Sequence, residues 1–515
     1  MRNVGKHAVI RVVCLVLGLV LLLGNRNGET TQESSAARLV FLSAERIESE
    51  GDLNAALEEY GFLVEQFPSS EWADDALLRI ALGWFRLGDY RACNDAAQRL
   101  IDGYPRTPSA AGGQALQATI VVTTARSTED FERARSAFRR IPLVFGPDAY
   151  PVLEWRTLAK ARAGEISLLL GEEDEAASML VDAIENEPRN RWTPRAMFAF
   201  AAVLYRQGQW QAAAQTLQAI VDEFVNSEQQ EVQQQVAAAK RRLTLLHRTL
   251  IRPRAGQPVW SRAGVLALGG GAVKRPIGIA ADSIGRLLIV DDDKDTVLMT
   301  DADGTVQRRR TVSGARRPWW GIDGTPFVLT ESFVTRADQI GHATFVGRKA
   351  DKPQPLKKLR AAETGLFGNW FLLDRNDRRL VQFGPDQTYL RTLIQGGRPE
   401  PVDIARDTDG RLYVLDRKNN TVVRFAADGA ASQPVVSRRW KRAEAITVDE
   451  LGNIYVLDRD ARTIEIFAPS GQLLGSAGPN LPGGVRLGSP RDIAVDGAGR
   501  LLIADRDTAA VMVLE

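Results

Sequence analysis

Two arrays of internal repeats with different hydrophobic periods constrain what this chain can fold into. Residues from about 36 to 247 carry apolar side chains at helical spacing, whereas residues from about 259 to 515 carry short β-rich runs separated by Asp and Gly turns. One repeat cannot bury its own apolar face, so neighbouring repeats must stack. The sequence therefore predicts a multidomain protein, with an N-terminal all-α superhelix and a C-terminal all-β domain.

Each helical unit has a small residue in its second helix, a glycine at the turn between its helices and a proline near its end. The small residues are Ala56, Cys93, Ala134, Ala176 and Ala213, at steps of 37, 41, 42 and 37 residues. The glycines are Gly51, Gly88, Gly171 and Gly208, and the prolines are Pro68, Pro105, Pro142 and Pro188. This pattern resembles the tetratricopeptide repeat (TPR) family, closely in four units and poorly over residues 128–147.

The resemblance implies a TPR helical-repeat domain over residues 36–248, with about five repeats and a polar-faced closing helix over residues 228–250. In that family the stacked helices form a concave groove that binds a peptide or a protein. We expect such a ligand here.

The β array has a period set by an acidic residue after the second strand of each unit. These residues are Asp291, Glu331, Asp374, Asp416, Asp458 and Asp505, at steps of 40, 43, 42, 42 and 47 residues. The strands recur clearly, as in residues 402–405, 412–417 and 421–425, except in two degenerate units around residues 321–334 and 365–383. The pattern resembles the NHL repeat and implies a six-bladed, TolB-like/NHL β-propeller over residues 259–515.

An extra strand offers an independent check on the propeller. The last unit stops at Glu515 after its third strand, whereas residues 264–268 form a strand ahead of the first unit. We expect this strand to complete the last blade and close the ring. Residues 249–258 contain Pro253, Gly256 and Pro258 and are expected to be a short, stiff linker.

The N-terminus is predicted to be a signal peptide or signal anchor over residues 1–27. Arg2, Lys6 and Arg11 precede an apolar run that is short for a membrane-spanning helix. No clear A-x-A cleavage site follows, so cleavage and retention as an anchor over residues 9–24 both stay open, as does a buried core helix. A leader of either kind implies export across the cytoplasmic membrane of a bacterium, to a periplasmic or secreted location in the cell envelope.

The C-terminal half is basic, because residues 252–515 hold 39 Lys and Arg against 32 Asp and Glu. In a four-stranded blade, the loop between the second and third strands shares a face with the loop leading into the first strand. The candidate partner-binding residues on this face are Arg275, Arg317, Arg375, Arg417, Arg442, Arg459, Arg491 and Arg506. Arginine suits carboxylate and phosphate, so the pattern predicts docking of an acidic protein or anionic polymer. A structural alternative stays open, in which each Asp caps its turn and each Arg pairs with a neighbouring blade.

Neither array contains a convincing catalytic constellation. The three histidines, His7, His247 and His342, are too few for the metal sites of the histidine-dependent six-bladed propeller enzymes. The two cysteines, Cys14 and Cys93, allow no disulfide framework. We therefore predict no enzyme activity, no cofactor and no metal.

The sequence predicts a protein-binding scaffold of the cell envelope, attached to the membrane if the leader is retained. One alternative is a lactonase-like metal-dependent hydrolase that uses the propeller pore, with Asp403, Asn453 or Asp492 as ligands. Another is a propeller that binds RNA or an anionic glycan. The predicted leader disfavours nucleic acid, because an exported protein meets little RNA.

Overall fold

The structure is a computed structural model that describes residues 29–251, 260–268, 273–349, 352–395, 397–427, 429 and 431–515. The chain divides into two compact units, Met1–Ala196 and Met197–Glu515. The predicted leader, with Cys14, and the predicted linker from residue 252 onward lie outside the described residues. The domain boundaries drawn from the repeats stay predictions, because the compact units follow packing and not repeat type.

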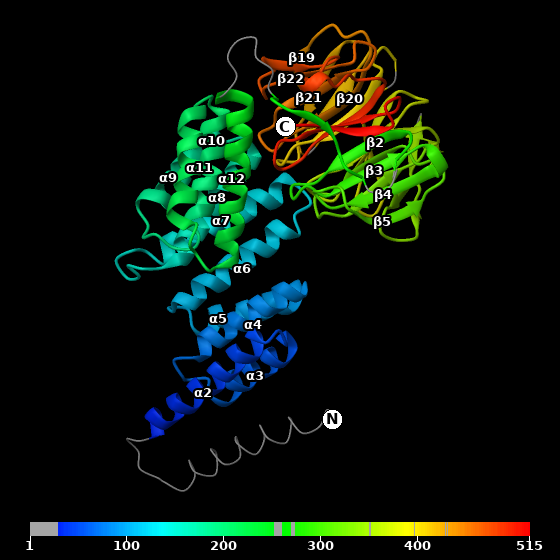
Figure 1. The fold of residues 1–515 in the computed structure, drawn as a ribbon. Helices are drawn as coiled ribbons and strands as arrows, with labels where there is room; N and C mark the ends of the chain where they lie inside the picture. Colours follow the sequence, from blue (N-terminus) through cyan, green and yellow to red (C-terminus); the bar gives the residue numbers. More distant parts are fainter. Residues whose placement is uncertain are drawn as a thin grey trace. The chain divides into compact units, whose positions relative to one another are not determined.

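The first unit is all-helical (Figure 1). Its helices are α2 (Glu29–Ser49), α3 (Leu53–Gln66), α4 (Ala73–Leu87), α5 (Tyr90–Gly103), α6 (Pro108–Thr123), α7 (Thr128–Val144), α8 (Glu154–Leu170) and α9 (Glu173–Glu185). Consecutive helices pack against one another, as the predicted superhelix requires. Among the described helices of the chain, none is long and apolar enough to cross a membrane.

The residues that revealed the helical repeats have the expected structural roles, with one exception. Ala56, Cys93 and Ala134 are fully buried, as are the two later members of that series. Gly88 ends α4 with a left-handed φ of 77°, which glycine adopts without strain. Pro142 was expected to end its unit, but it lies inside α7, which continues to Val144. Pro142 has no amide to donate to the preceding turn, and α7 continues for two residues despite the loss of one helical hydrogen bond.

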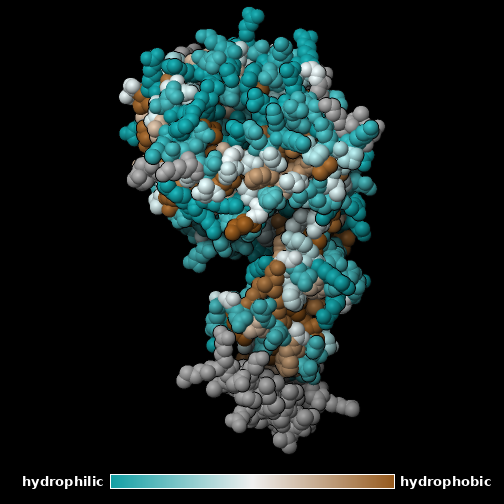
Figure 2. Space-filling view, turned by 90° about the vertical axis from the view of Figure 1, so that its right-hand side faces the viewer, coloured by the Kyte–Doolittle hydropathy of each residue, from teal (hydrophilic) through white to brown (hydrophobic). Residues whose placement is uncertain are grey.

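Hydrophobic side chains remain exposed along the first helices. Leu39 and Leu42 of α2 are 65% and 45% exposed, and Leu87 at the end of α4 is 45% exposed. The space-filling view shows hydrophobic residues gathered in patches on a largely hydrophilic surface (Figure 2). Exposed apolar patches of this kind are typical of surfaces that bind proteins.

The second unit begins with helices and continues as six four-stranded antiparallel sheets. Its helices are α10 (Thr193–Arg206), which spans the division between the units, α11 (Trp210–Phe224) and α12 (Gln230–Leu246), followed by the π-helical turn η1 (His247–Ile251). Most of its blades use strands that are consecutive in the sequence.

Blade 1 is β2 (Pro276–Ala281), β3 (Leu287–Asp291), β4 (Thr296–Thr300) and β5 (Val306–Thr311), and blade 2 is β6 (Arg317–Trp320), β7 (Pro326–Leu329), β8 (Val334–Arg336) and β9 (His342–Ala343). A hairpin, β10 (Val346–Lys349) and β11 (Lys352–Pro355), separates blade 2 from blade 3, which is β12 (Leu359–Thr364), β13 (Trp370–Asp374), β14 (Arg379–Phe383) and β15 (Tyr389–Ile394). Blade 4 is β16 (Pro401–Arg406), β17 (Leu412–Asp416), β18 (Thr421–Phe425) and β19 (Ala431–Ser437), and blade 5 is β20 (Ala443–Val448), β21 (Ile454–Asp458), β22 (Thr463–Phe467) and β23 (Leu473–Ala477). The sixth sheet is β24 (Pro490–Val495), β25 (Leu501–Asp505), β26 (Ala510–Leu514) and β1 (Ala263–Val265). The six-bladed propeller predicted from the sequence is confirmed.

The extra strand ahead of the first blade closes the ring. β1 pairs antiparallel with β26, and Gly264 lies opposite Val513. The backbone amide of Leu266 continues the ladder and donates to the carbonyl of Val511 at 2.9 Å. The six inner strands then form an unbroken circle, because β24 of the last blade packs against β2 of the first.

The acidic residues that set the β period end the second strands and hold two loops together. The carboxylate of Asp458 accepts backbone N–H bonds from Lys441 at 2.6 Å and Arg442 at 2.9 Å, in the loop before the inner strand. It also accepts from Ala461 at 3.1 Å, in its own turn. Glu331, which marks the same position of the period in blade 2, does not have this role. Glu331 is exposed, and the hydroxyl of Thr330 accepts the turn amides instead.

The helices of the second unit pack on the propeller face that carries the turns between first and second strands. Arg242 of α12 lies 3.8 Å from Glu450, and Arg248 donates to the carbonyl of Ala498 at 3.1 Å. The closing helix α12 buries an apolar face formed by Val232, Val236, Ala239, Leu245 and Leu246, while Glu231, Gln234 and Lys240 are exposed.

A buried hydrogen-bond network joins α10 to blade 5. The Tyr205 hydroxyl donates to the Asn453 amide oxygen at 2.8 Å, and the Asn453 amide nitrogen donates to Asp449 at 2.8 Å. The Tyr455 hydroxyl donates to the same Asp449 carboxylate at 2.9 Å. Because an unpaired buried polar group costs about 1–3 kcal/mol, this network fixes the helices on one face of the propeller.

Ring closure predicts a large effect of proline at one position of β1 and a small effect at the neighbouring position. Leu266→Pro removes the amide that donates to Val511, so the free energy of unfolding should fall by about 2–3 kcal/mol. Val265→Pro should cost less than about 1 kcal/mol, because strand amides alternate in direction and the side chain of Val265 is 60% exposed. Denaturant unfolding of the full chain, followed by tryptophan fluorescence, measures both.

Leu266→Ala is the matched control for the first variant, because it shortens the same side chain and keeps the amide. Leu266→Pro should destabilise the protein more than Leu266→Ala does. Equal unfolding free energies for the two proline variants would show that the β1–β26 pairing does not hold the ring closed.

Candidate functional site

Five of the six inner strands carry an irregularity at the same position. The pairing with the second strand slips between the first and third residues of β2, β12, β16, β20 and β24. The residues skipped by the pairing are Ile277, Arg360, Val402, Glu444 and Arg491. A bulge redirects the side chain it carries. Four of these side chains, all except that of Val402, line a single cavity at one end of the circle of inner strands.

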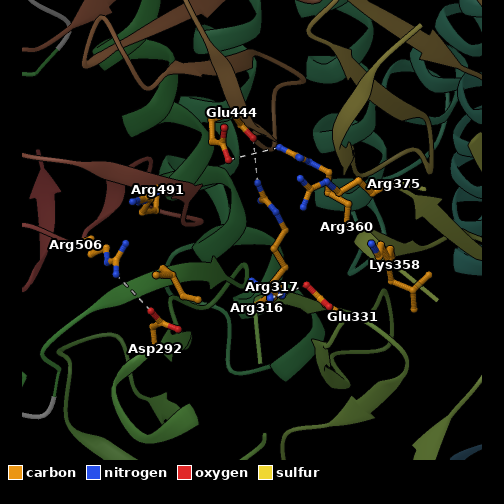
Figure 3. Close-up of a pocket in the computed structure, with 12 residues that line it drawn as sticks. Asp292, Arg316, Arg317, Glu331, Lys358, Arg360, Arg375, Glu444, Arg491 and Arg506 are labelled. Carbon is orange, nitrogen blue, oxygen red and sulfur yellow. Dashed lines mark hydrogen bonds and ion pairs between the residues drawn. The ribbon is translucent and has the colours of Figure 1, made fainter. Parts of the chain in front are cut away.

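This cavity, the cationic cup, has a volume of about 290 Å³. Its cationic side chains are Arg316, Arg317, Lys358, Arg360, Arg375, Arg491 and Arg506, and its acidic ones are Asp292, Glu331 and Glu444 (Figure 3). Ile277 and Leu359 complete the lining. The lining therefore has a formal excess of four positive charges.

Glu444 is the main counterion on one side of the cup. Arg417 donates to its carboxylate at 3.1 Å, and guanidinium nitrogens of Arg360 and Arg442 lie 3.5 Å and 3.6 Å from it. Burial alone would raise the pKa of Glu444, but the surrounding arginines outweigh burial and lower it. Glu444 therefore stays ionised and holds three arginines at the mouth.

Arg317 forms the floor of the cup. One of its guanidinium nitrogens lies 2.7 Å from a carboxylate oxygen of Asp492 and 3.0 Å from one of Asp403, and both carboxylates are almost fully buried. The other nitrogen donates to the backbone carbonyl of Glu444 at 3.2 Å. Arg317 also lines a second cavity of about 150 Å³ between the inner strands, so its side chain separates the cup from that channel.

Three cationic side chains of the cup have no carboxylate partner. Within the described part of the chain, no acidic side chain lies within ion-pair distance of Lys358, Arg375 or Arg491. The Nε atom of Arg491 is buried and has no hydrogen-bond partner among the described residues. Such a donor is costly to leave unpaired, by about 1–3 kcal/mol.

Two arginines of the cup, Arg360 and Arg491, also lie in surroundings that disfavour their positive charge. Burial, together with the neighbouring Arg417 and Arg317, lowers the pKa of Arg360 to about 10 against the attraction of Glu444. Burial also lowers the pKa of Arg491, together with the nearby Arg459. Both arginines stay protonated at neutral pH, but in surroundings that disfavour the positive charge.

The eight predicted arginines gather around the cup. Arg317, Arg375, Arg491 and Arg506 line it. Arg417 and Arg442 contact Glu444, Arg275 lies 2.9 Å from Asp292, and Arg459 acts on the pKa of Arg491. Several of them also make the structural contacts that were the alternative interpretation. Arg417, for example, donates to the carbonyl of Ala443 in the next blade at 3.0 Å.

The sequence analysis missed Arg316, Lys358, Arg360 and Glu444. Arg360 and Glu444 have a detectable signal, because each is the second residue of an inner strand, as Arg491 is. That position carries the bulge and lies two residues after the last amide that the Asp of the second strand holds. Lys358 belongs to a degenerate repeat, where no such alignment was available.

The residues considered for a metal site do not converge. Asp403 and Asp492 flank Arg317, which occupies the place between the two carboxylates. Asn453 lies in the turn between the first and second strands of blade 5 and bonds Tyr205 on the other face. Within the described residues, no group of three or more His, Cys, Asp or Glu side chains is placed to hold a metal ion.

Comparison with known protein families identifies both kinds of repeat. The tetratricopeptide repeat model matches residues 75–107 and 195–227, which cover α4–α5 and α10–α11. The NHL repeat model matches residues 399–425, which cover the first three strands of blade 4. The chain therefore contains TPR repeats and an NHL repeat. No curated protein matches this sequence.

Several solved propeller structures are similar to about half of this chain. A streptogramin B lyase structure is 13% identical with a TM-score of 0.38, and the match covers 49% of this chain and 97% of the lyase. A luciferin-regenerating enzyme is 14% identical with a TM-score of 0.37, over 49% of this chain and 94% of the enzyme. Virginiamycin B lyase from Staphylococcus aureus is 15% identical with a TM-score of 0.34, over 47% and 81%. Such distant likeness carries no information on activity.

The buried carboxylate Asp403 predicts a measurable pH dependence of stability. Burial raises its pKa to about 7, against the pull of Arg317. Because the folded state holds this proton more tightly than the unfolded state does, the contribution of Asp403 to stability is full below about pH 4 and is lost as the pH rises through 7. Asp403→Asn should remove about 1–3 kcal/mol of the stability difference between pH 5 and pH 8.

Unfolding by denaturant at both pH values, for the parent and the variant, tests this. An asparagine oxygen can still accept the backbone bond that Ile446 donates to Asp403 at 2.8 Å, so the variant should fold. Identical pH profiles for the parent and Asp403→Asn would show that Asp403 does not titrate in this range.

Proposed function

We propose that this protein is a non-enzymatic, protein-binding scaffold whose propeller docks an acidic partner around the cationic cup. TPR and NHL repeats are generally protein-interaction modules, which favours a protein ligand over a chemical reaction. The observation that carries the proposal is the excess of positive charge at the cup, where seven cationic side chains face three acidic ones. Arginine clusters of this kind suit carboxylate-rich surfaces.

The two faces of the propeller support this assignment. The helices α10 and α12 contact the turns between first and second strands, through Tyr205 and Arg242. The cup lies at the opposite ends of the inner strands, away from those turns. One face is therefore used within the chain, and the arginine-rich face remains available to a partner.

The TPR region supplies a second binding surface in this proposal. Leu39, Leu42 and Leu87 are large apolar side chains exposed along its first helices. An amphipathic or extended peptide could cover such side chains in a superhelical groove. A scaffold with two binding surfaces of different chemistry, one apolar and one cationic, would hold two partners at once.

We place this function outside the cytoplasm, in the cell envelope. The support is the basic and apolar pattern of residues 1–27, which is typical of a signal peptide or signal anchor. In this proposal a retained leader would tether the scaffold to the membrane.

Docking on the basic face predicts binding of a polyglutamate peptide that depends on arginines around the cup. The triple variant Arg275→Ser, Arg442→Ser and Arg459→Ser removes three charges outside the cup lining. It should bind fluorescent polyglutamate at least about tenfold more weakly, because each charge contributes long-range attraction at low salt. Fluorescence anisotropy at several salt concentrations measures affinity and its salt dependence, which should become shallower.

The matched control removes the same charge elsewhere. Arg91→Ser, Arg140→Ser and Arg309→Ser change three exposed arginines on two helices and an outer strand. The control should bind polyglutamate within about twofold of the parent. If both triple variants weakened polyglutamate binding equally, the loss of affinity would follow from net charge alone. The proposal of a docking face would then have no support.

Export predicts the outcome of a topology experiment. Alkaline phosphatase, which is active only outside the cytoplasm, is fused after Glu515 and expressed in a bacterium. The fusion should be active, and deletion of residues 1–27 should abolish activity while leaving expression unchanged. An inactive full-length fusion at normal expression would reverse the assignment.

A further inference from the structure

Arg317 lies at the floor of the cationic cup. It spans the floor between the buried carboxylates of Asp403 and Asp492, at 3.0 Å and 2.7 Å. Because these ion pairs hold the guanidinium between the cup and the second cavity, a polymer threaded along the axis would have to break them. A compact group that enters by the mouth would leave them intact.

The charged side chains of the cup indicate the charge of the ligand. Seven cationic side chains and three acidic ones line the cavity, and the two carboxylates beneath Arg317 bring the negative groups to five. The cup with its floor thus retains a formal excess of at least two positive charges, and more where Asp403, whose pKa burial raises to about 7, is protonated. A ligand with at least two negative charges would offset this excess.

The unpartnered donors show where the ligand would bind. Arg491 has a buried Nε without a hydrogen-bond partner among the described residues, and Arg375 has no acidic neighbour there. The positive charge of Arg506 is only weakly offset. Its guanidinium lies 3.7 Å from Asp292, and Asp292 lies closer to Arg275, at 2.9 Å. These arginines come from blades 3 and 6, so they approach the cavity from different sides (Figure 3).

The size of the cavity limits the ligand to a small one. A volume of about 290 Å³ is at the lower end for small-molecule sites. It accommodates a phosphate or a short dicarboxylate with some water, and not a folded acidic surface. Guanidinium groups suit both ligands, because each presents paired oxygens to their N–H groups.

We infer that the cationic cup is a discrete binding site for one compact dianion, a phosphate group or a short dicarboxylate, held by Arg491, Arg375 and Arg506. This site is separate from the docking of an acidic protein on the surrounding face. It gives the propeller a small-ligand site at its axis, whose occupancy would neutralise the centre of the docking face.

Isothermal titration of the full chain with sodium phosphate and with sodium succinate, at low ionic strength, tests the inference. At least one of the two should bind with a stoichiometry of one and compete with the other. Sodium acetate, with a single charge, should bind at least about tenfold more weakly. The arm that binds more tightly identifies the class of dianion.

Two variants and one control locate the site. Arg491→Gln and Arg375→Gln should each weaken dianion binding at least about tenfold, and neither residue has a side-chain bond to the described fold that its loss would break. Arg309→Gln, on the exposed outer strand β5, removes the same charge and should leave the affinity unchanged. Thermal melting of each variant checks that the fold is kept.

Two results would overturn the inference. One is the absence of saturable binding of phosphate and of succinate up to about 10 mM, a limit that corresponds to only a few kcal/mol of affinity. The other is equal weakening by Arg309→Gln and by Arg491→Gln, which would indicate diffuse attraction. If polyglutamate binding still depended on Arg275, Arg442 and Arg459, the proposed docking face would be retained. Only the dianion site would be rejected.

Discussion

The pairing of β1 with β26 is the constraint on which the propeller and its site depend. Without it, the last blade would end in an open edge at Val513, and the six inner strands would form an arc. The cup exists only because inner strands from opposite sides of the circle bring side chains to one axis. Arg317 of blade 2 reaches Asp403 of blade 4 and Asp492 of blade 6, a set that an arc would not assemble.

Closure positions the strands, and two local devices then position the side chains. An Asp at the end of the second strand, such as Asp458, binds the backbone amides just before the inner strand of its own blade begins. The bulge that follows turns the second residue of that strand toward the mouth, as for Glu444 and Arg491. A purely structural repeat thus presents a side chain that can vary from blade to blade, which explains how apolar, acidic and basic residues share one position.

The features that repeat along the chain could be predicted from the sequence. The features in which single repeats differ from the others could not. Period and turn chemistry were enough for the two repeat types, six blades and the closing strand. They did not reveal that Thr330 takes the place of the capping Asp in blade 2, and they placed the end of a repeat at Pro142, which lies inside α7. The eight arginines could be placed on one face from topology. The cup itself could not, because bulges and the degenerate segment around Lys358 are not visible as a period.

The hydrogen-bond network at blade 5 and the cationic cup differ in how their buried polar groups are paired. Where α10 meets blade 5, Tyr205, Asn453 and Asp449 pair every buried polar group that the network contains, which is what a permanent contact requires. At the cup, Arg491 keeps an unpaired buried donor, and arginines crowd one another although Glu444 offsets some of their charge. Stability alone favours pairing or removing such groups. Their retention at one end of the axis, where no acidic side chain of the described residues pairs with Arg491 or Arg375, supports a charge supplied from outside the chain.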